Sequence, residues 1–101
     1  IRGDGIREAA FDAKKLEGAI FRARRDGDVF APLGMEGEQK LKKTLQDAGV
    51  DRPFRDLIPV LAKGDRILWI AGLKPSREAA IDEKTTSAVL VCFTGRFPWE
   101  L

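Results

Sequence analysis

Residues 59–71 carry the pattern that decides the fold, and they read PVLAKGDRILWIA. Two apolar runs, 59–62 and 67–71, flank the polar turn 63–66, which contains one glycine. Apolar runs of this length joined by a short polar turn are typical of a β-hairpin. The second run has no polar residue, which indicates a strand buried on both faces. We therefore expect Trp69, in the middle of that run, to lie in the core.

A helix is predicted on the N-terminal side of this hairpin. Leu41, Leu45 and Ala48 follow one another at helical spacing and predict a helix over 38–48 with a narrow apolar stripe. Gly49 suits the left-handed backbone conformation that commonly follows the end of such a helix, and Val50 can then contact Leu45.

The other elements are shorter. Asp51 can cap a second helix over 52–57, which Pro59 ends. Short apolar segments predict strands over 8–12, 19–25 and 88–93; residues 26–37 and 72–77 are expected to be loops, and a single helical turn is expected over 82–85. The sequence therefore predicts an α+β fold, a single compact domain over 1–101 with about five mainly antiparallel strands and two central helices.

Composition excludes several kinds of enzyme. The 101 residues contain no histidine, no tyrosine and one cysteine, Cys92. These counts rule out three kinds of site: a nucleophile paired with histidine, a zinc site, and an internal disulfide framework. No catalytic residue and no metal ligand is therefore assigned. Because disulfides are rare in reducing compartments, a single cysteine fits a cytoplasmic protein, and Cys92 itself is expected to be a small buried hydrophobic residue.

The apolar pattern also argues against a membrane protein. The longest apolar run, 67–71, is far too short to cross a bilayer, so no membrane partner is expected. The chain begins with isoleucine rather than methionine, and we expect it to be a piece of a larger protein.

Basic residues are concentrated in the middle of the chain. The net charge is +2, but between Arg22 and Arg77 twelve basic residues face eight acidic ones. Such a centre permits contact with nucleic acid. The candidate RNA-binding residues form three groups: Arg22, Arg24 and Arg25; Lys40, Lys42 and Lys43; and Arg52 and Arg55.

Each group also has a plainer interpretation. Asp26 and Asp28 can neutralise the first group in a local ion-pair cluster. The lysines can be the solvated face of an amphipathic helix. Asp51 or Asp56 can pair with Arg52 and Arg55, an arrangement that the sequence slightly favours for these two arginines.

Three other pairs of residues are of types that can bind ligands. Gly34 and Gly37 are expected to be turn residues, since two lone glycines make no phosphate loop. Asp26 and Asp28 offer too few oxygens to indicate a cation site. Trp99 and Phe97 can stack on bases in principle, but a tail packed on the domain is the expected arrangement.

An ordered series of short motifs adds a resemblance to a known family. The series is RRDGD (24–28), FAPLGMEG (30–37), KLKK (40–43), DAGV (47–50), Arg52, Arg55, IPVL (58–61), Gly64 and ILWIAGL (67–73). In this order and spacing it resembles the C-terminal domain of the tRNA(Ile)-lysidine synthetases over about residues 11–93. Residues 1–10 and 94–101 lie outside the resemblance.

The resemblance implies both a function and a division of labour. Enzymes of this family use ATP, with Mg²⁺, to adenylate the wobble cytidine of a minor tRNA(Ile), and lysine then displaces AMP to give lysidine. That chemistry belongs to an N-terminal domain with a Ser-Gly-Gly-x-Asp-Ser loop. This loop does not occur here, so the chain alone is expected to hold no cofactor and to be inactive.

The C-terminal domain of the family is implied to be an accessory that holds the tRNA(Ile) acceptor stem, with a fold related to a domain of the phenylalanyl-tRNA synthetase beta subunit. Its expected partners are that stem and the N-terminal catalytic domain of the same polypeptide. The alternative from another class is a protein-interaction or structural module that positions the catalytic domain without contacting RNA.

One departure from the family pattern limits the site. Glu38 and Gln39 begin the predicted helix, at positions where the family often carries small or basic residues, and Glu36 lies just before them. Acidic side chains favour a helix N-terminus but repel an approaching phosphate. This departure therefore weakens the case for phosphate binding at this helix start.

Overall fold

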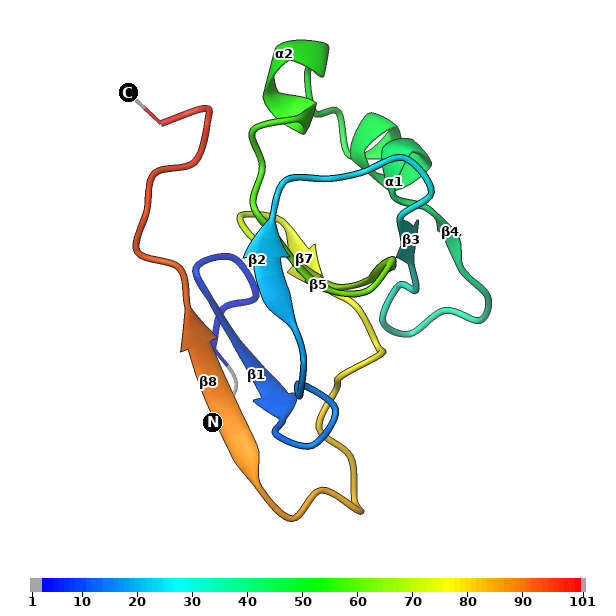
Figure 1. Ribbon diagram of the computed structural model, residues 1–101, viewed down its shortest axis with the longest axis vertical. Helices are drawn as coiled ribbons and strands as arrows, with labels where there is room; N and C mark the ends of the chain where they lie inside the picture. Colours follow the sequence, from blue (N-terminus) through cyan, green and yellow to red (C-terminus); the bar gives the residue numbers. More distant parts are fainter. Residues whose placement is uncertain (1–2, 101) are drawn as a thin grey trace.

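The structure, a computed structural model, describes residues 3–100 and contains two sheets and two short helices (Figure 1). The predicted hairpin is confirmed: β5 (Val60–Lys63) pairs antiparallel with β6 (Arg66–Ile70). Trp69 is fully buried, as expected, and its indole N–H donates to the Gly5 carbonyl oxygen at 2.9 Å.

The larger sheet is built around this hairpin in the order β2-β5-β6-β3-β4, with β7 also pairing with β6. The added strands are β2 (Ile20–Arg22), β3 (Val29–Phe30), β4 (Gln39–Lys40) and β7 (Lys74–Pro75). All pairings in it are antiparallel except β3 with β6. A second sheet pairs β1 (Glu8–Asp12) antiparallel with β8 (Ala88–Cys92).

The hairpin separates two apolar clusters. Ile67 and Ile70 pack with α1 residues in one cluster, whereas Leu68 and Trp69 pack with Phe11 and its neighbours in the other. Strict alternation along a strand would not place two consecutive residues together. The pairing register shifts between Leu61 and Ala62, which skips Leu68 and forms a β-bulge, and this bulge explains the arrangement.

The two helices lie together at one end of the molecule (Figure 1). They are α1 (Leu41–Asp47) and α2 (Arg52–Arg55). The end predicted for α1 is confirmed: Gly49 has φ +76°, and the Val50 N–H donates to the Leu45 carbonyl oxygen at 3.1 Å. The start is wrong, because residues 39–40 extend along β3 instead of continuing the helix.

Several other predictions need correction. Ala48 is exposed, and Thr44 takes its place on the buried stripe of α1. The strand predicted over 19–25 covers only 20–22, and the segments expected to be loops contain β3 and β7. Cys92 is exposed rather than buried, because β8 lies at the edge of a two-stranded sheet.

The C-terminal segment packs on the domain, as expected for a tail. Phe97 is buried and its ring stacks on that of Phe93, with centroids 5.1 Å apart. The turn at Asp82 is also confirmed, since the Thr85 N–H donates to the Asp82 carbonyl oxygen at 3.1 Å. Among residues 3–100, no helix is long and apolar enough to span a bilayer.

Candidate nucleic-acid interface

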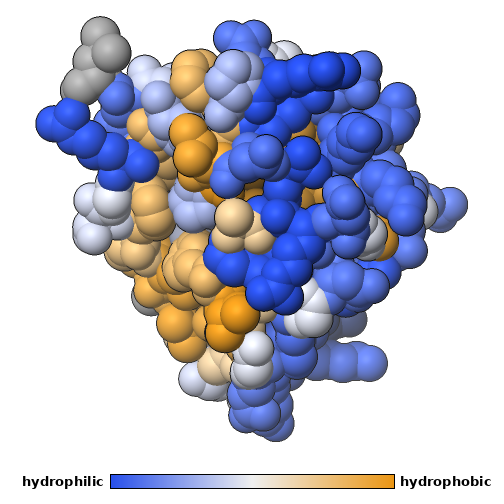
Figure 2. Space-filling view, turned by 45° about the horizontal axis from the view of Figure 1, so that its top comes forward, coloured by the Kyte–Doolittle hydropathy of each residue, from blue (hydrophilic) through white to orange (hydrophobic). Residues whose placement is uncertain are grey.

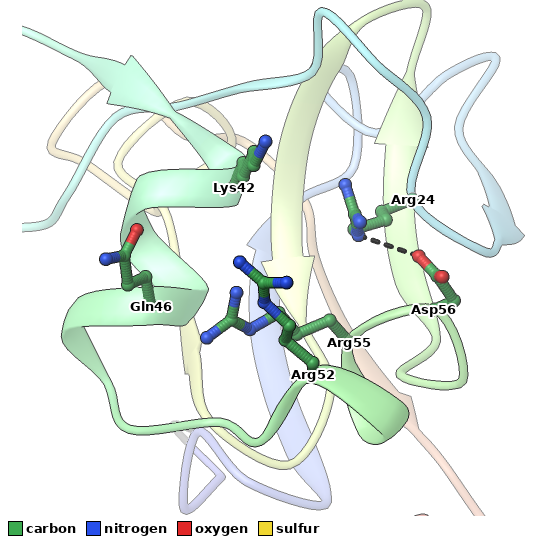
Figure 3. Close-up of a pocket in the computed structure, with 6 residues that line it drawn as sticks. All are labelled: Arg24, Lys42, Gln46, Arg52, Arg55 and Asp56. Carbon is green, nitrogen blue, oxygen red and sulfur yellow. Dashed lines mark ion pairs between the residues drawn. The ribbon is translucent and has the colours of Figure 1, made fainter.

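Two adjoining hollows near the helices share Arg24 and Lys42, and we call them together the basic cleft. The larger, of about 420 Å³, is also lined by Gln46, Arg52, Arg55 and Asp56 (Figure 3). The smaller, of about 250 Å³, is also lined by residues 25–28 and Lys40. Figure 2, which brings the helical end forward, shows hydrophilic residues over most of this face and a band of hydrophobic ones beside them. The cleft thus joins residues from all three predicted groups.

The α2 helix places Arg52 and Arg55 next to each other in the larger hollow. They are three residues apart and therefore neighbours on the helix surface. Arg55 Nε donates to the Val50 carbonyl oxygen at 2.8 Å, which orients its guanidinium. In Figure 3 both guanidinium groups extend toward the side of the hollow on which Lys42 lies.

The expected pairing of these two arginines with Asp51 or Asp56 is wrong. No carboxylate of residues 3–100 lies within 4.0 Å of either guanidinium, and Asp56 pairs instead with Arg24. Two cations side by side with no anion between them repel each other, so an anionic ligand is the group that such an arrangement favours.

The three lysines have different surroundings. Lys42 lines both hollows and Lys40 lines the smaller one. Lys43 lines neither, and its Nζ lies 3.5 Å from an Asp47 carboxylate oxygen. Gln46, which the sequence analysis did not consider, follows Lys42 by four residues on the same helix face, and that spacing is the signal that could have found it.

Arg22 is held inside the protein. Its Nη1 and Nη2 donate to the two carboxylate oxygens of Asp28 at 2.8 and 2.7 Å, and Nη2 also donates to the Gly64 carbonyl oxygen at 2.8 Å. The side chains of Arg22 and Asp28 are only 8% and 2% exposed. For this arginine the structure therefore shows the ion pair that the sequence left open, and Arg22 is unavailable to a ligand.

The same pair shapes the turn that carries Arg24 and Arg25. Asp28 also accepts the Arg25 backbone N–H at 2.7 Å. Burial raises the pKa of the Asp28 carboxyl, but the hydrogen bonds from Arg22 and Arg25 outweigh burial, and the pKa lies below its ordinary value of 3.8. Asp28 is therefore a carboxylate at neutral pH and fixes the turn.

Arg24 and Arg25 differ in how they are held. Arg24 Nε lies 2.9 Å from an Asp56 carboxylate oxygen, but its N–H makes no hydrogen bond there, so the attraction is only that between opposite charges. Arg25 is exposed, and within the described part of the chain no carboxylate forms an ion pair with it. Both remain at the cleft.

Glu38, which lies shortly before α1, is paired with Arg66. Glu38 accepts from Arg66 Nη2 at 2.6 Å, and Glu78 pairs with the same guanidinium. The hydrogen bonds that Arg66 donates to Glu38 and Glu78 raise the pKa of its guanidinium. Gly34 and Gly37 have φ of +74° and +82°, so both are turn residues as predicted. Across residues 3–100, no group of three or more potential metal ligands occurs.

Comparison with known proteins assigns the chain to a family. Residues 20–92 match the family described as "TilS substrate C-terminal domain". The tRNA(Ile)-lysidine synthase of Caldanaerobacter subterraneus subsp. tengcongensis is 39% identical over 83% of this chain and 18% of its own length. The tRNA(Ile)-lysidine synthase of Symbiobacterium thermophilum is 41% identical over 83% of this chain and 18% of its own length. The tRNA(Ile)-lysidine synthase of Clostridium tetani is 33% identical over all of this chain and 22% of its own length.

A solved structure agrees. A crystal structure of a TilS C-terminal domain superposes with a TM-score of 0.70 at 30% identity, covering 89% of this chain and 70% of that one. The chain spans about a fifth of the length of the curated relatives. On the sequence match and the shared α+β fold, this chain belongs to the family of C-terminal domains of tRNA(Ile)-lysidine synthases.

Proposed function

We propose that the chain binds tRNA through the basic cleft and serves as the RNA-holding accessory of a lysidine-forming ligase. The observation that carries the proposal is the convergence of Lys42, Arg52 and Arg55 on one hollow with no carboxylate of residues 3–100 paired to any of them. In this proposal ATP, Mg²⁺ and the bond-forming steps belong to the catalytic part of the parent enzyme, and tRNA(Ile) is the RNA that the family implies.

The chemistry of the cleft fits a phosphate backbone. Arginine guanidinium groups donate in pairs to phosphate oxygens, and most hydrogen bonds between proteins and nucleic acids go to the phosphates and sugars. Such contacts fix position without selecting sequence. A docking role at the acceptor stem, away from the reacting base, needs contacts of this kind.

A salt titration of RNA binding tests the cleft. We expect the double substitution Arg52→Ala/Arg55→Ala to weaken binding of an RNA hairpin with an acceptor-stem sequence. It should also reduce the slope of the logarithm of the binding constant against the logarithm of the salt concentration by about two, because each lost phosphate contact removes about one unit. Fluorescence anisotropy from low to physiological salt measures both quantities, and circular dichroism verifies that the variant is folded.

Two neighbouring lysines provide the matched control. Lys42→Ala and Lys43→Ala each remove one charge from the same helix, but only Lys42 lines the cleft. We expect Lys42→Ala to flatten the slope by about one unit and Lys43→Ala to leave it unchanged. Equal slopes for all variants and the parent chain would mean that RNA does not enter the cleft, and the interaction-module alternative would then replace the proposal.

A further inference from the structure

A third hollow, of about 380 Å³, is also lined by residues of α2. It is lined by Val50, Phe54, Leu73, Trp99, Gly49, Asp51 and Gly72. Along residues 51–55, Asp51 and Phe54 line this apolar hollow, whereas Arg52 and Arg55 line the basic cleft. The two cavities therefore lie against different sides of one helical turn, and a helix is about 10–12 Å across with its side chains.

Trp99 forms a rigid wall of the apolar hollow. Its ring stacks on Phe97, with centroids 5.2 Å apart and planes 20° apart, and Phe97 stacks in turn on Phe93. Phe97 is buried, whereas Trp99 is 40% exposed. Because Phe97 backs one face of the indole, the exposed area lies on its other face and its edge.

Two further contacts hold Trp99 in place. A Cβ on Gly72 would lie 2.7 and 2.8 Å from two carbons of the indole ring, so the ring rests directly on the backbone there. Glu100, next in the chain, accepts the Phe97 N–H at 3.0 Å and pairs with Arg7. The indole is therefore positioned before any ligand arrives.

We propose that the apolar hollow accepts an unpaired nucleobase of the RNA whose backbone occupies the basic cleft, and that this base stacks on Trp99. The inference rests on the proposed function. A flat aromatic face beside arginines suits a nucleotide, because the base needs a stacking partner and the phosphate needs cations. Bases within a duplex are held by their partners and covered by their neighbours, so only an unpaired base can enter.

Asp51 adds a preference among bases. It precedes α2 as its N-cap residue, yet its side chain caps no backbone N–H. A carboxylate in the wall accepts hydrogen bonds only. Adenine, cytosine and guanine each carry an amino group that donates them, whereas the one edge donor of uracil, N3–H, lies between two carbonyl oxygens that repel a carboxylate. The hollow should therefore favour bases with an amino group over uracil.

The test compares a blunt RNA duplex of two separate strands with the same duplex carrying two unpaired adenosines at one 3′ end. We expect the unmodified chain to bind the overhang form more tightly. Trp99→Ala should weaken that form by about 5- to 150-fold, the range for losing one stacked base, and leave the blunt form unchanged. Trp99→Phe should keep most of the preference. A 2-aminopurine in the overhang should be quenched by the unmodified chain and not by Trp99→Ala.

The base preference has its own control. Replacing the two adenosines with uridines should reduce the gain in affinity that the overhang gives. Asp51→Asn should narrow the difference in affinity between the adenosine and uridine overhangs, because an amide both donates and accepts hydrogen bonds.

The outcomes separate this inference from the proposed function. If blunt and overhang forms bind equally with an intact salt slope, the cleft binds RNA and the stacking inference is wrong. If Trp99→Ala weakens both forms alike, Trp99 supports the fold and does not stack on a base, which also overturns the inference. Loss of binding to both forms by the unmodified chain would overturn the proposed function itself.

Discussion

Replacing Trp69 with alanine is expected to lower the free energy of unfolding by about 3–5 kcal/mol, the usual cost of removing a buried aromatic side chain. Trp69 is fully buried, and its ring contacts those of Phe11 and Phe21, with centroids 6.2 and 5.9 Å away. The substitution leaves a cavity between these rings and the Gly5 carbonyl oxygen without its donor. Urea unfolding followed by far-UV circular dichroism measures the loss.

Two companion variants isolate the cause. Trp69→Phe keeps much of the buried ring and removes the donor to Gly5, so its cost should fall between those of the parent chain and Trp69→Ala. Ile20→Ala, at a side chain that is 54% exposed, should change the free energy of unfolding by less than about 0.5 kcal/mol. A transition of Trp69→Ala identical to that of the parent chain would contradict the buried position of this residue.

Asp28→Ala is expected to cost about 3–5 kcal/mol, because it leaves the guanidinium of Arg22 buried without its counter-charge. The pair is bidentate and almost inaccessible to solvent. In the double variant Arg22→Met/Asp28→Ala neither charge is buried, and we expect it to be more stable than Asp28→Ala alone. If the losses in the free energy of unfolding for Arg22→Met and Asp28→Ala added up to the loss for the double variant, the two charges would not depend on each other.

The pH dependence of the same pair follows from the lowered pKa of Asp28. A carboxyl whose pKa is lower in the folded state stabilises the fold fully above its ordinary value of 3.8, and this contribution is lost as the pH falls through the lower folded-state pKa. The stability difference between the parent chain and Asp28→Asn should therefore be constant near neutral pH and shrink below about pH 3.8. A difference that stays constant to pH 2 would contradict this pairing.

Local signals in the sequence predicted the local parts of the fold. The β5–β6 hairpin and the glycine end of α1 follow from residues adjacent in the chain, and both are present. The bulge that skips Leu68 could not be predicted, because it depends on how β5 meets β6 rather than on the pattern of either strand. The two-residue strands β3 and β4 exist only through pairing with distant or neighbouring segments, which leaves no periodicity to detect.

The ion pairs of the candidate site could likewise be predicted only in part from the sequence. Spacing alone placed Arg52 and Arg55 together on one helix surface. Their lack of a carboxylate partner depends on Arg24, which comes from another element and takes Asp56. Likewise, Arg22 and Arg24 belong to one predicted strand, 19–25, yet one is buried against Asp28 and the other lines the cleft. Which cation meets which anion is decided by the tertiary structure.

The bond from Arg22 to the Gly64 carbonyl oxygen ties the turn that carries Arg24 and Arg25 to the tip of the central hairpin. If the chain binds tRNA as proposed, a genetic screen for loss of that binding should therefore recover substitutions at the hairpin tip and at Asp28, although neither position needs to touch RNA. In such a screen these alleles would look like contact mutants. They should differ from true ones in being rescued by lower growth temperature, because their defect is in holding the turn and not in the charge that it presents.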